Sequence, residues 1–201
     1  MESRKRILKV AVELMTKEGL AALSMREVAR RAGVSHQAPY HYFENREAIL
    51  AAIAEEGFKK FNATLQSASG SNAVARLIAA GRAYIGFALS HPAHFQVMFR
   101  PELVNLHKYP SALAEANRGF AILQSLIDGT VKEKFLPARR AHGMVILAWS
   151  FVHGLSGLLL EGPLARMAGD LKSKQEIASA LRTFEFLISC RGKGRSLRTR
   201  Q

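Results

Sequence analysis

Apolar side chains recur at helical spacing along most of this chain, and no segment alternates apolar and polar residues as a strand would. In residues 4–18, for example, Ile7, Ala11, Leu14 and Met15 fall on one face. Segments with the same periodicity cover residues 46–66, 73–89, 92–100, 110–135, 138–160 and 174–189. Prolines stand at several of their boundaries, where helices begin or end. The pattern predicts an all-α protein of about nine helices.

Residues 24–47, SMREVARRAGVSHQAPYHYFENRE, have the pattern of a short helix, a tight turn and a second short helix. We expect a capping box at the first helix, in which Ser24 accepts from the Glu27 amide and the Glu27 carboxylate accepts from the Ser24 amide. Gly33 stands where a helix ends in a left-handed residue. Ser35 is the expected cap of the second helix.

The second helix is expected over residues 36–43, with Pro39 at the upper limit of its first turn. Its side chains are polar or aromatic, so they gain little from packing on the core of their own protein. Such a helix suits the major groove of DNA, where side-chain donors and acceptors meet base edges. Asn45 is the expected cap of the long helix that follows.

These residues carry a resemblance. The stretch RILKVAVELMTKEGLAALSMREVARRAGVSHQAPYHYFENREAIL resembles the DNA-binding domain of TetR-family transcriptional regulators. The tail Y-x-Y-F-x-N-R-E departs from the usual Y-x-H-F-x-x-K-E at Tyr42 and Arg46, and both residues keep a donor that can hold a phosphate. Further along, W-x3-H-G (Trp149, His153, Gly154) is similar to the signature of a subfamily with the WHG C-terminal domain.

The resemblance implies an N-terminal three-helix helix-turn-helix domain and a C-terminal helical domain for ligand binding and dimerisation. A polar break at residues 67–72 separates them, so we place the domains at residues 1–65 and 66–190. Residues 164–173 form an expected linker. Residues 191–201 form a basic tail that is either a solvated terminus or an extra contact with the DNA backbone.

The last two long helices are the expected homodimer interface, because family members pair them as a four-helix bundle. Two stripes of apolar and small residues support this: Val145, Ala148, Trp149, Val152, Leu155, Ser156 and Leu159, and Ile177, Leu181, Phe184, Leu187 and Ile188. The alternative is that both stripes are core within one chain. A two-fold dimer places two reading helices in successive major grooves, roughly 34–36 Å apart, and implies a pseudo-palindromic operator in double-stranded DNA.

Resemblance and side-chain chemistry divide the expected DNA contacts into two classes. The base readers are His36, Gln37 and His41. The contacts with the DNA backbone are Ser24, Arg26, Ser35, Tyr40, Tyr42 and Arg46, the last at a helix N-terminus where backbone amides also favour a phosphate. Phe43 is an expected core residue.

The C-terminal half contains apolar and aromatic residues that could line a ligand pocket. The candidates are Tyr84, Phe87, Phe95, Met98, Phe99, Phe120, Leu123, Ile127, Met144, Trp149 and His153. Methionine and phenylalanine together suit an adaptable pocket for a neutral or largely apolar effector. Ordinary core packing is the alternative at each position. His91, His94 and Glu102 do not complete a metal-binding set, so we expect no metal and no cofactor.

Charge and composition narrow the function. The chain has 29 Lys and Arg against 16 Asp and Glu, a formal charge of +13, which favours an anionic partner such as nucleic acid or an acidic membrane surface. A single cysteine fits a reducing cytoplasm, and no uninterrupted apolar run reaches membrane-spanning length. No catalytic motif is present, so we expect no enzyme.

The prediction is a dimeric, cytoplasmic TetR-like repressor that a small effector releases from its operator. The alternative is a basic protein that binds DNA or membrane surfaces without sequence specificity.

Overall fold

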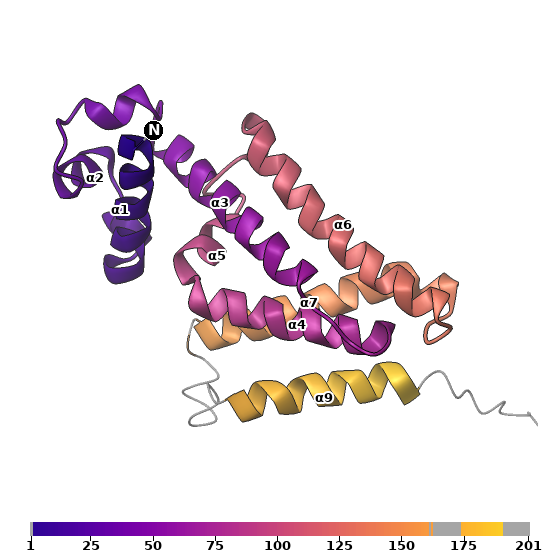
Figure 1. Cartoon of the computed structure of the whole chain (residues 1–201). Helices are drawn as coiled ribbons and strands as arrows, with labels where there is room; N and C mark the ends of the chain where they lie inside the picture. Colours follow the sequence, from indigo (N-terminus) through magenta and orange to yellow (C-terminus); the bar gives the residue numbers. More distant parts are fainter. Residues whose placement is uncertain (1, 161, 163–173, 191–201) are drawn as a thin grey trace, which may run out of the picture. The chain divides into compact units, whose positions relative to one another are not determined.

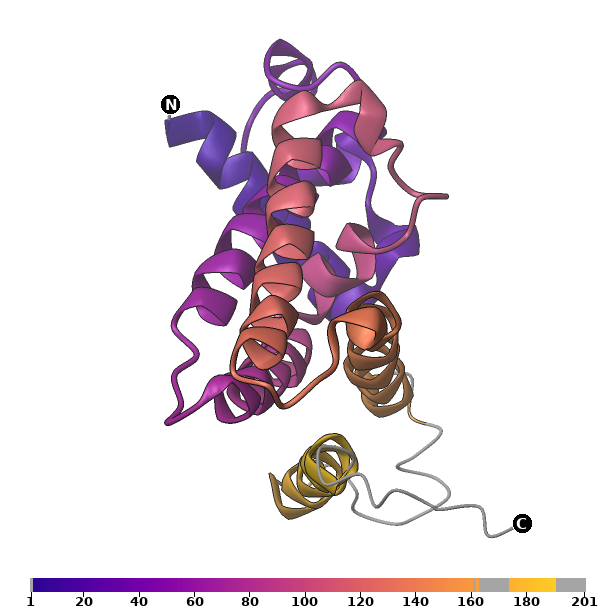
Figure 2. The same cartoon turned by 90° about the vertical axis from the view of Figure 1, so that its right-hand side faces the viewer.

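The structure is a computed structural model that describes residues 2–160, 162 and 174–190. Across these ranges the chain forms eight α-helices and four short 3₁₀ turns, without a strand (Figures 1 and 2). The all-α prediction is confirmed. The expected linker at residues 164–173 and the basic tail at residues 191–201 lie outside the described residues.

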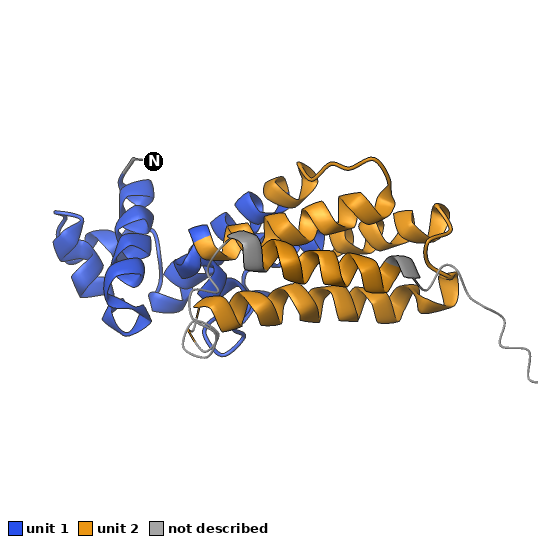
Figure 3. Ribbon diagram, turned by 90° about the horizontal axis from the view of Figure 1, so that it is seen from below, with its two compact units in different colours: residues 1–62, 90–119 blue, residues 63–89, 120–201 orange. Residues whose placement is uncertain are grey.

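The chain divides into two compact units (Figure 3). Unit 1 contains residues 1–62 and 90–119, and unit 2 contains residues 63–89 and 120–201. The N-terminal domain expected at residues 1–65 therefore packs together with a later segment of the chain.

Unit 1 is built on α1 (Glu2–Glu18), α2 (Met25–Arg31) and most of α3 (Arg46–Gln66). It also holds the turns η1 (Leu20–Ala22), η2 (Ala38–His41) and η3 (Leu106–Lys108), the helix α5 (Pro92–Met98) and the first part of α6 (Pro110–Lys132). Its fully buried side chains include Ile7, Leu14, Val28, Ile49, Ile53 and Val97. Phe43 is 3% exposed, which confirms its place in the core.

Unit 2 contains α4 (Ala73–Ser90) up to its last residue, the rest of α6, the turn η4 (Ala138–Arg140), α7 (Ala141–Leu160) and α9 (Lys174–Cys190). A Cβ added at Gly81 of α4 would lie 3.3 Å from Val152 on α7 and 3.4 Å from Leu181 on α9. The rings of Phe151 and Phe184 stack 4.5 Å apart, which joins α7 to α9. Three helices therefore meet around this glycine.

The burial of its side chains shows which face of α7 belongs to the core of unit 2. Val145, Ala148, Val152, Ser156 and Leu159 are buried, and so are Leu181, Phe184 and Ile188 on α9. These residues make up most of the two stripes that we expected at the dimer interface, so that assignment is wrong for them. The apolar side chains that remain exposed are Ile146, Leu147, Trp149 and Leu158 on α7, and Phe186 and Leu187 on α9.

Two helical stretches are long and apolar enough to cross a bilayer by length and composition alone. They are Ala73–Ser90, half of which is buried, and Ala138–Leu160, of which little is buried. The apolar core helices of soluble proteins have the same length and composition.

Candidate nucleic-acid interface

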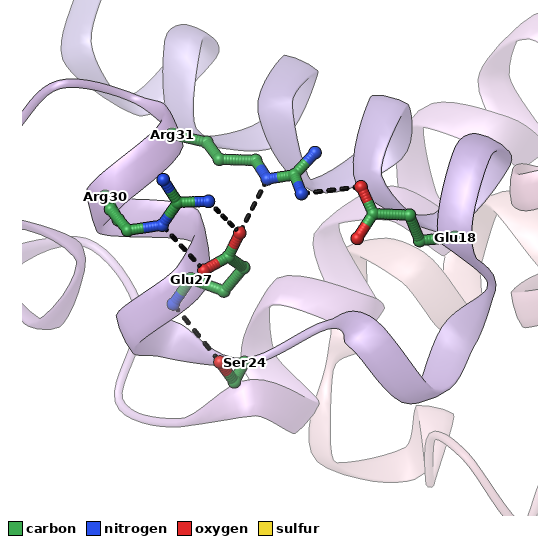
Figure 4. Close-up of polar contacts among 5 residues, drawn as sticks. All are labelled: Glu18, Ser24, Glu27, Arg30 and Arg31. Carbon is green, nitrogen blue, oxygen red and sulfur yellow. Dashed lines mark hydrogen bonds and ion pairs between the residues drawn. The ribbon is translucent and has the colours of Figure 1, made fainter.

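Helix α2 begins as the sequence predicts. The Glu27 amide donates to the Ser24 hydroxyl oxygen at 3.2 Å. The reciprocal half of the expected capping box is wrong, because the Glu27 carboxylate accepts instead from Arg30 at 2.6 and 2.9 Å and from Arg31 at 2.6 Å (Figure 4). Arg31 also pairs with Glu18 at 2.5 Å, which ties α2 to the end of α1. The carboxylate bonds these charged donors, one turn away, in preference to a backbone amide because hydrogen bonds between charged groups are stronger.

Hydrogen bonds from Arg30 and Arg31 lower the pKa of Glu27 from 4.5 to about 2. A carboxylate whose pKa is lower in the folded state stabilises the fold above its unfolded pKa and stops doing so as the pH falls through the folded pKa. We therefore expect Glu27→Gln to be less stable than wild type at neutral pH, with the difference disappearing between pH 4.5 and pH 2. Urea unfolding across this range measures it. Glu44→Gln is the control, and an identical pH dependence in both variants would contradict the assignment.

Residues 36–43, which we call the recognition segment, were expected to form an α-helix that reads DNA. The structure of this segment is shorter and tighter than an α-helix. It forms the 3₁₀ turn η2, whose N-cap is Gln37 rather than Ser35. An α-helix capped by Ser35 needs an amide at position 39 to bond the Ser35 carbonyl, and Pro39 has none. The Ala38 amide makes that bond instead, at 3.0 Å, and the Tyr40 amide bonds Gln37 in the same 3₁₀ pattern. The helix expectation is wrong because of the missing donor.

The turn before this segment has the predicted form, with Gly33 at φ +61°. The three expected base readers, His36, Gln37 and His41, are all exposed. The rings of His36 and Tyr40 lie 6.1 Å apart. Of the expected backbone contacts, Ser24, Arg26 and Ser35 are exposed as well, and Tyr40 and Tyr42 are 45% and 42% exposed. Residues 35–42 thus form a run in which every polar and aromatic side chain is exposed.

Arg46 differs from the other expected contacts because it is half-buried and bonded within the chain. Its Nε donates to the carbonyl of Leu23 at 2.8 Å and its Nη2 to the carbonyl of Leu20 at 3.0 Å. These carbonyls belong to η1 and the residue after it, more than twenty positions earlier. The guanidinium therefore links the start of α3 to the residues that precede α2. The sequence carries no mark of this contact, because the acceptors are backbone atoms.

Two further contacts around the interface were not expected. The Arg4 guanidinium lies over the Phe43 ring, 5.2 Å from its centroid, a cation–π geometry. The Glu47 carboxylate accepts from the Asn105 amide at 3.1 Å and from Lys108 Nζ at 3.3 Å. The Asn105 amide, and after it Lys108, lower the pKa of Glu47. Phe43, just before α3, thus contacts α1, and the beginning of α3 is held by the cap and the last residue of η3.

The expected ligand-pocket residues fall into both units. In unit 1, Phe95 and Phe99 belong to a ring cluster in which Phe99 lies 5.1 Å from Phe95 and 5.6 Å from Phe58, and Met98 is buried. In unit 2, Phe87 and Ile127 are buried, and Leu123 and Met144 are half-buried. A hollow of about 40 Å³ in unit 2 includes Tyr84 in its wall. That volume holds water but no organic ligand.

Four of the expected residues come together in unit 2. The Tyr84 hydroxyl bonds His153 Nδ1 at 2.7 Å, and the Trp149 ring lies 6.4 Å from His153 and 6.3 Å from Phe120. Burial raises the pKa of Tyr84, with a hydrogen bond to Trp149 opposing it, and burial lowers the pKa of His153. Both groups are therefore uncharged near neutral pH. Trp149 and Phe120 are 40% and 49% exposed, so the cluster offers open aromatic surface.

Comparisons with known proteins cover both halves of the chain. The family model described as bacterial regulatory proteins, tetR family, matches residues 7–53. The model described as tetracyclin repressor-like, C-terminal domain, matches residues 77–184.

Individual relatives match over shorter stretches. The class C tetracycline repressor of Escherichia coli is 38% identical over 52 residues, which are 26% of this chain and 24% of that protein. The transcriptional repressor KstR of Rhodococcus jostii is 33% identical over 76 residues, 38% of this chain and 36% of that protein. The chain thus aligns with little more than a third of these relatives at most.

Solved structures match over nearly the whole chain. A protein of unknown function from Rhodococcus sp. RHA1 is 25% identical, with a TM-score of 0.76 and 94% of each chain covered. The regulator FadR of Bacillus subtilis, in complex with stearoyl-CoA, is 15% identical, with a TM-score of 0.71 and 92% and 98% of the two chains covered. The second likeness shows the fold alone.

Proposed function

This chain belongs to the TetR family of bacterial regulatory proteins, and we propose that it is a dimeric, cytoplasmic repressor that binds an operator and leaves it when a small, largely apolar effector binds. The observation that carries the proposal is the run of exposed residues around η2, which follows a helix and a glycine turn.

Sequence-specific DNA binding is supported by the short recognition segment and by the formal charge of +13. The test is a fluorescence-anisotropy titration, at near-physiological salt, on DNA from upstream of the protein's own gene and on a scrambled duplex of equal length. We expect a preference of about a thousandfold or more for the operator. Equal, salt-sensitive binding to duplexes from every candidate operator would favour the second function, a basic protein that binds anionic surfaces by charge alone.

Gln37 can read one base, because its amide can pair bidentately with adenine. We expect Gln37→Ala to relax the preference at one operator position by about 1–3 kcal/mol and to leave non-specific binding unchanged. Arg26→Ala is the matched comparison on α2. Loss of this exposed cation should weaken all sequences alike and lower the salt slope by about one. Titrations on a set of single-base operator variants measure both. Identical profiles for the two variants would contradict the division of roles.

Dimerisation through the last two long helices is supported by the surface that unit 2 leaves uncovered. Leu147 and Leu158 on α7 are 53% and 45% exposed, and Phe186 on α9 is 64% exposed. A Cβ added at Gly154 would meet no atom within 4 Å, so the helix backbone is open to close approach there. Large apolar side chains gathered beside small residues are typical of a protein–protein interface.

The effector site is supported by the cluster of Tyr84, His153, Trp149 and Phe120. Its aromatic faces and uncharged polar groups fit a neutral, largely apolar molecule. We propose that the effector favours a second state of the dimer, whose reading segments no longer match the operator. Only a difference in its affinity for the two states can drive release.

Trp149 is the only tryptophan of the chain, so its fluorescence reports this cluster directly. We expect an effector that releases the operator to change Trp149 emission at the same concentrations, and Phe120→Ala to weaken both effects. A panel of uncharged and charged apolar compounds, tested in both assays, checks this. An effector that releases DNA without any change in Trp149 emission would place the site elsewhere.

A further inference from the structure

Unit 1 contains a second candidate binding site, distinct from both the DNA-reading segment and the proposed effector cluster. It is a groove of about 640 Å³ between α1 and α3, with His94 of α5 in its wall. Five basic, three acidic and three apolar residues complete the lining. A volume of this size is within the range of small-molecule sites.

His94 is the least usual member of the lining. The residue is 4% exposed, and its Nε2 has no hydrogen-bond partner in the described part of the chain. The carboxylate of Glu56 comes within 3.6 Å of that nitrogen, which is beyond hydrogen-bond distance. Glu56 is also bonded to Lys60. A buried polar atom without a partner costs free energy, and an oxygen atom placed in the groove would remove that cost.

The position of His94 is fixed by close packing between α3 and α5. A Cβ added at Gly57 would lie 3.1 Å from the Cβ of His94 and 2.6 Å from the sulfur of Met98. The two helices therefore touch at this glycine, and this close packing fixes the position of the His94 Cβ. Burial lowers the pKa of His94, with nearby Lys60 adding to the effect and the Glu56 carboxylate opposing it, so the ring is uncharged near neutral pH.

The charges of the lining favour an anion. Each of the three acidic residues pairs with a lysine four positions away on its own helix: Lys9 with Glu13, Lys59 with Glu55, and Lys60 with Glu56. Arg4 and Lys5 are the two basic residues of the lining outside these pairs. The groove thus has a formal excess of two positive charges, beside an apolar floor of Leu8, Val12 and Ala52.

We propose that this groove binds a small organic acid, with its carboxylate facing Arg4 and Lys5. An oxygen of the ligand accepts a hydrogen bond from Nε2 of His94, and its short apolar part lies on the floor. The ligand contacts both α1 and α3, the helices that hold the DNA-reading segment. It can therefore influence operator affinity from a site other than the effector cluster.

Three probes of equal chain length test the proposal on the full chain: hexanoate, hexanol and hexylammonium. The imidazole signal of His94 is followed by NMR and assigned by its absence in His94→Phe. We expect hexanoate to shift this signal saturably at millimolar concentrations, and the two other probes to leave it in place. An equal response to all three probes would overturn the anionic class of ligand. No saturable response to any of them would overturn the site.

Matched variants separate the groove from general attraction to a basic protein. We expect Lys5→Gln to weaken hexanoate binding about three- to tenfold by calorimetry, because a charge-assisted contact is lost. Lys17→Gln removes the same charge from an exposed position of α1 outside the groove and should have no effect. His94→Phe should abolish binding while thermal unfolding shows a folded chain. Equal losses in Lys5→Gln and Lys17→Gln would contradict the proposal. None of these measurements involves DNA, so their outcome is independent of the proposed function.

Discussion

Leu158→Asp is expected to split the proposed dimer into monomers and to remove the proposed operator binding, while each chain stays folded. Leu158 is already 45% exposed within one chain, so a carboxylate there stays solvated in the monomer. In the proposed dimer the same carboxylate would be buried in an apolar interface without a partner, which is strongly unfavourable.

The effect on DNA binding should be large because the recognition segment is short. In the proposed complex, one chain would contact only a few base pairs through η2, and a two-fold dimer would double these contacts on a pseudo-palindromic operator. Since specific binding usually exceeds non-specific binding by about 10³ or more, loss of one half-site should reduce operator affinity more than about a hundredfold. Charge-driven binding to random DNA should change little.

Sedimentation equilibrium and anisotropy titration measure the two effects of Leu158→Asp. Ala121→Asp is the matched control, because Ala121 is exposed on α6 in the same unit. It should leave both the mass and the operator affinity unchanged. If Leu158→Asp sediments as a dimer and binds the operator normally, the pairing face is elsewhere.

The parts of the fold that could be predicted from sequence are those decided over one helical turn. Ser24 and Asn45 cap their helices as expected, with hydrogen bonds of 3.2 and 3.0 Å. Gly19 and Gly33 have positive φ at helix ends, where residues with side chains are strained. In each case the residue type and its position in the chain determine the local geometry.

The parts that could not be predicted depend on competition between partners or on contacts far apart in the sequence. The Glu27 carboxylate had several possible donors within reach, and spacing alone does not rank them. Pro39 lacks the amide that an α-helix capped by Ser35 needs, and a proline near a helix start does not by itself show which backbone bond is lost. Arg46 bonds carbonyls of Leu20 and Leu23, and backbone acceptors have no signature in the sequence.

Periodicity failed on α7 for a different reason. This helix has apolar or small residues around most of its circumference. The sequence therefore indicates that most of its surface is buried, but it does not show whether the same chain or a partner chain buries each face. The face of Val152 and Leu159 is covered by its own chain. The face of Leu158 is left for a partner in our proposal. A stripe of apolar residues on a helix can be assigned to a dimer interface only after the residues that form the core of the single chain are known.

Arg46→Ala is expected to destabilise the protein rather than to act only on DNA. The substitution removes two charge-assisted donors from part-buried carbonyls, at 2.8 and 3.0 Å. Hydrogen bonds to charged groups contribute about 1.5–3 kcal/mol, so we expect a loss of about this size in the free energy of unfolding. Operator affinity should fall because the start of α3 is no longer fastened to the entrance of α2. Arg46→Lys should recover only part of the loss, since one ammonium lacks the planar fork that spans two carbonyls.

The salt dependence of DNA binding separates this positioning role from a contact with phosphate. A phosphate contact at Arg46 predicts a salt slope lower by about one in Arg46→Ala, with unfolding unchanged. If Arg46 acts instead through its two hydrogen bonds to backbone carbonyls, Arg46→Ala should have lower stability and weaker specific binding, with an unchanged salt slope. Arg26→Ala supplies the opposite reference, since the exposed Arg26 should affect the slope and not the stability. Denaturant unfolding and salt titrations of both variants decide between the two roles. A phosphate contact changes the salt slope and leaves the stability unchanged, whereas the positioning role changes the stability and leaves the salt slope unchanged.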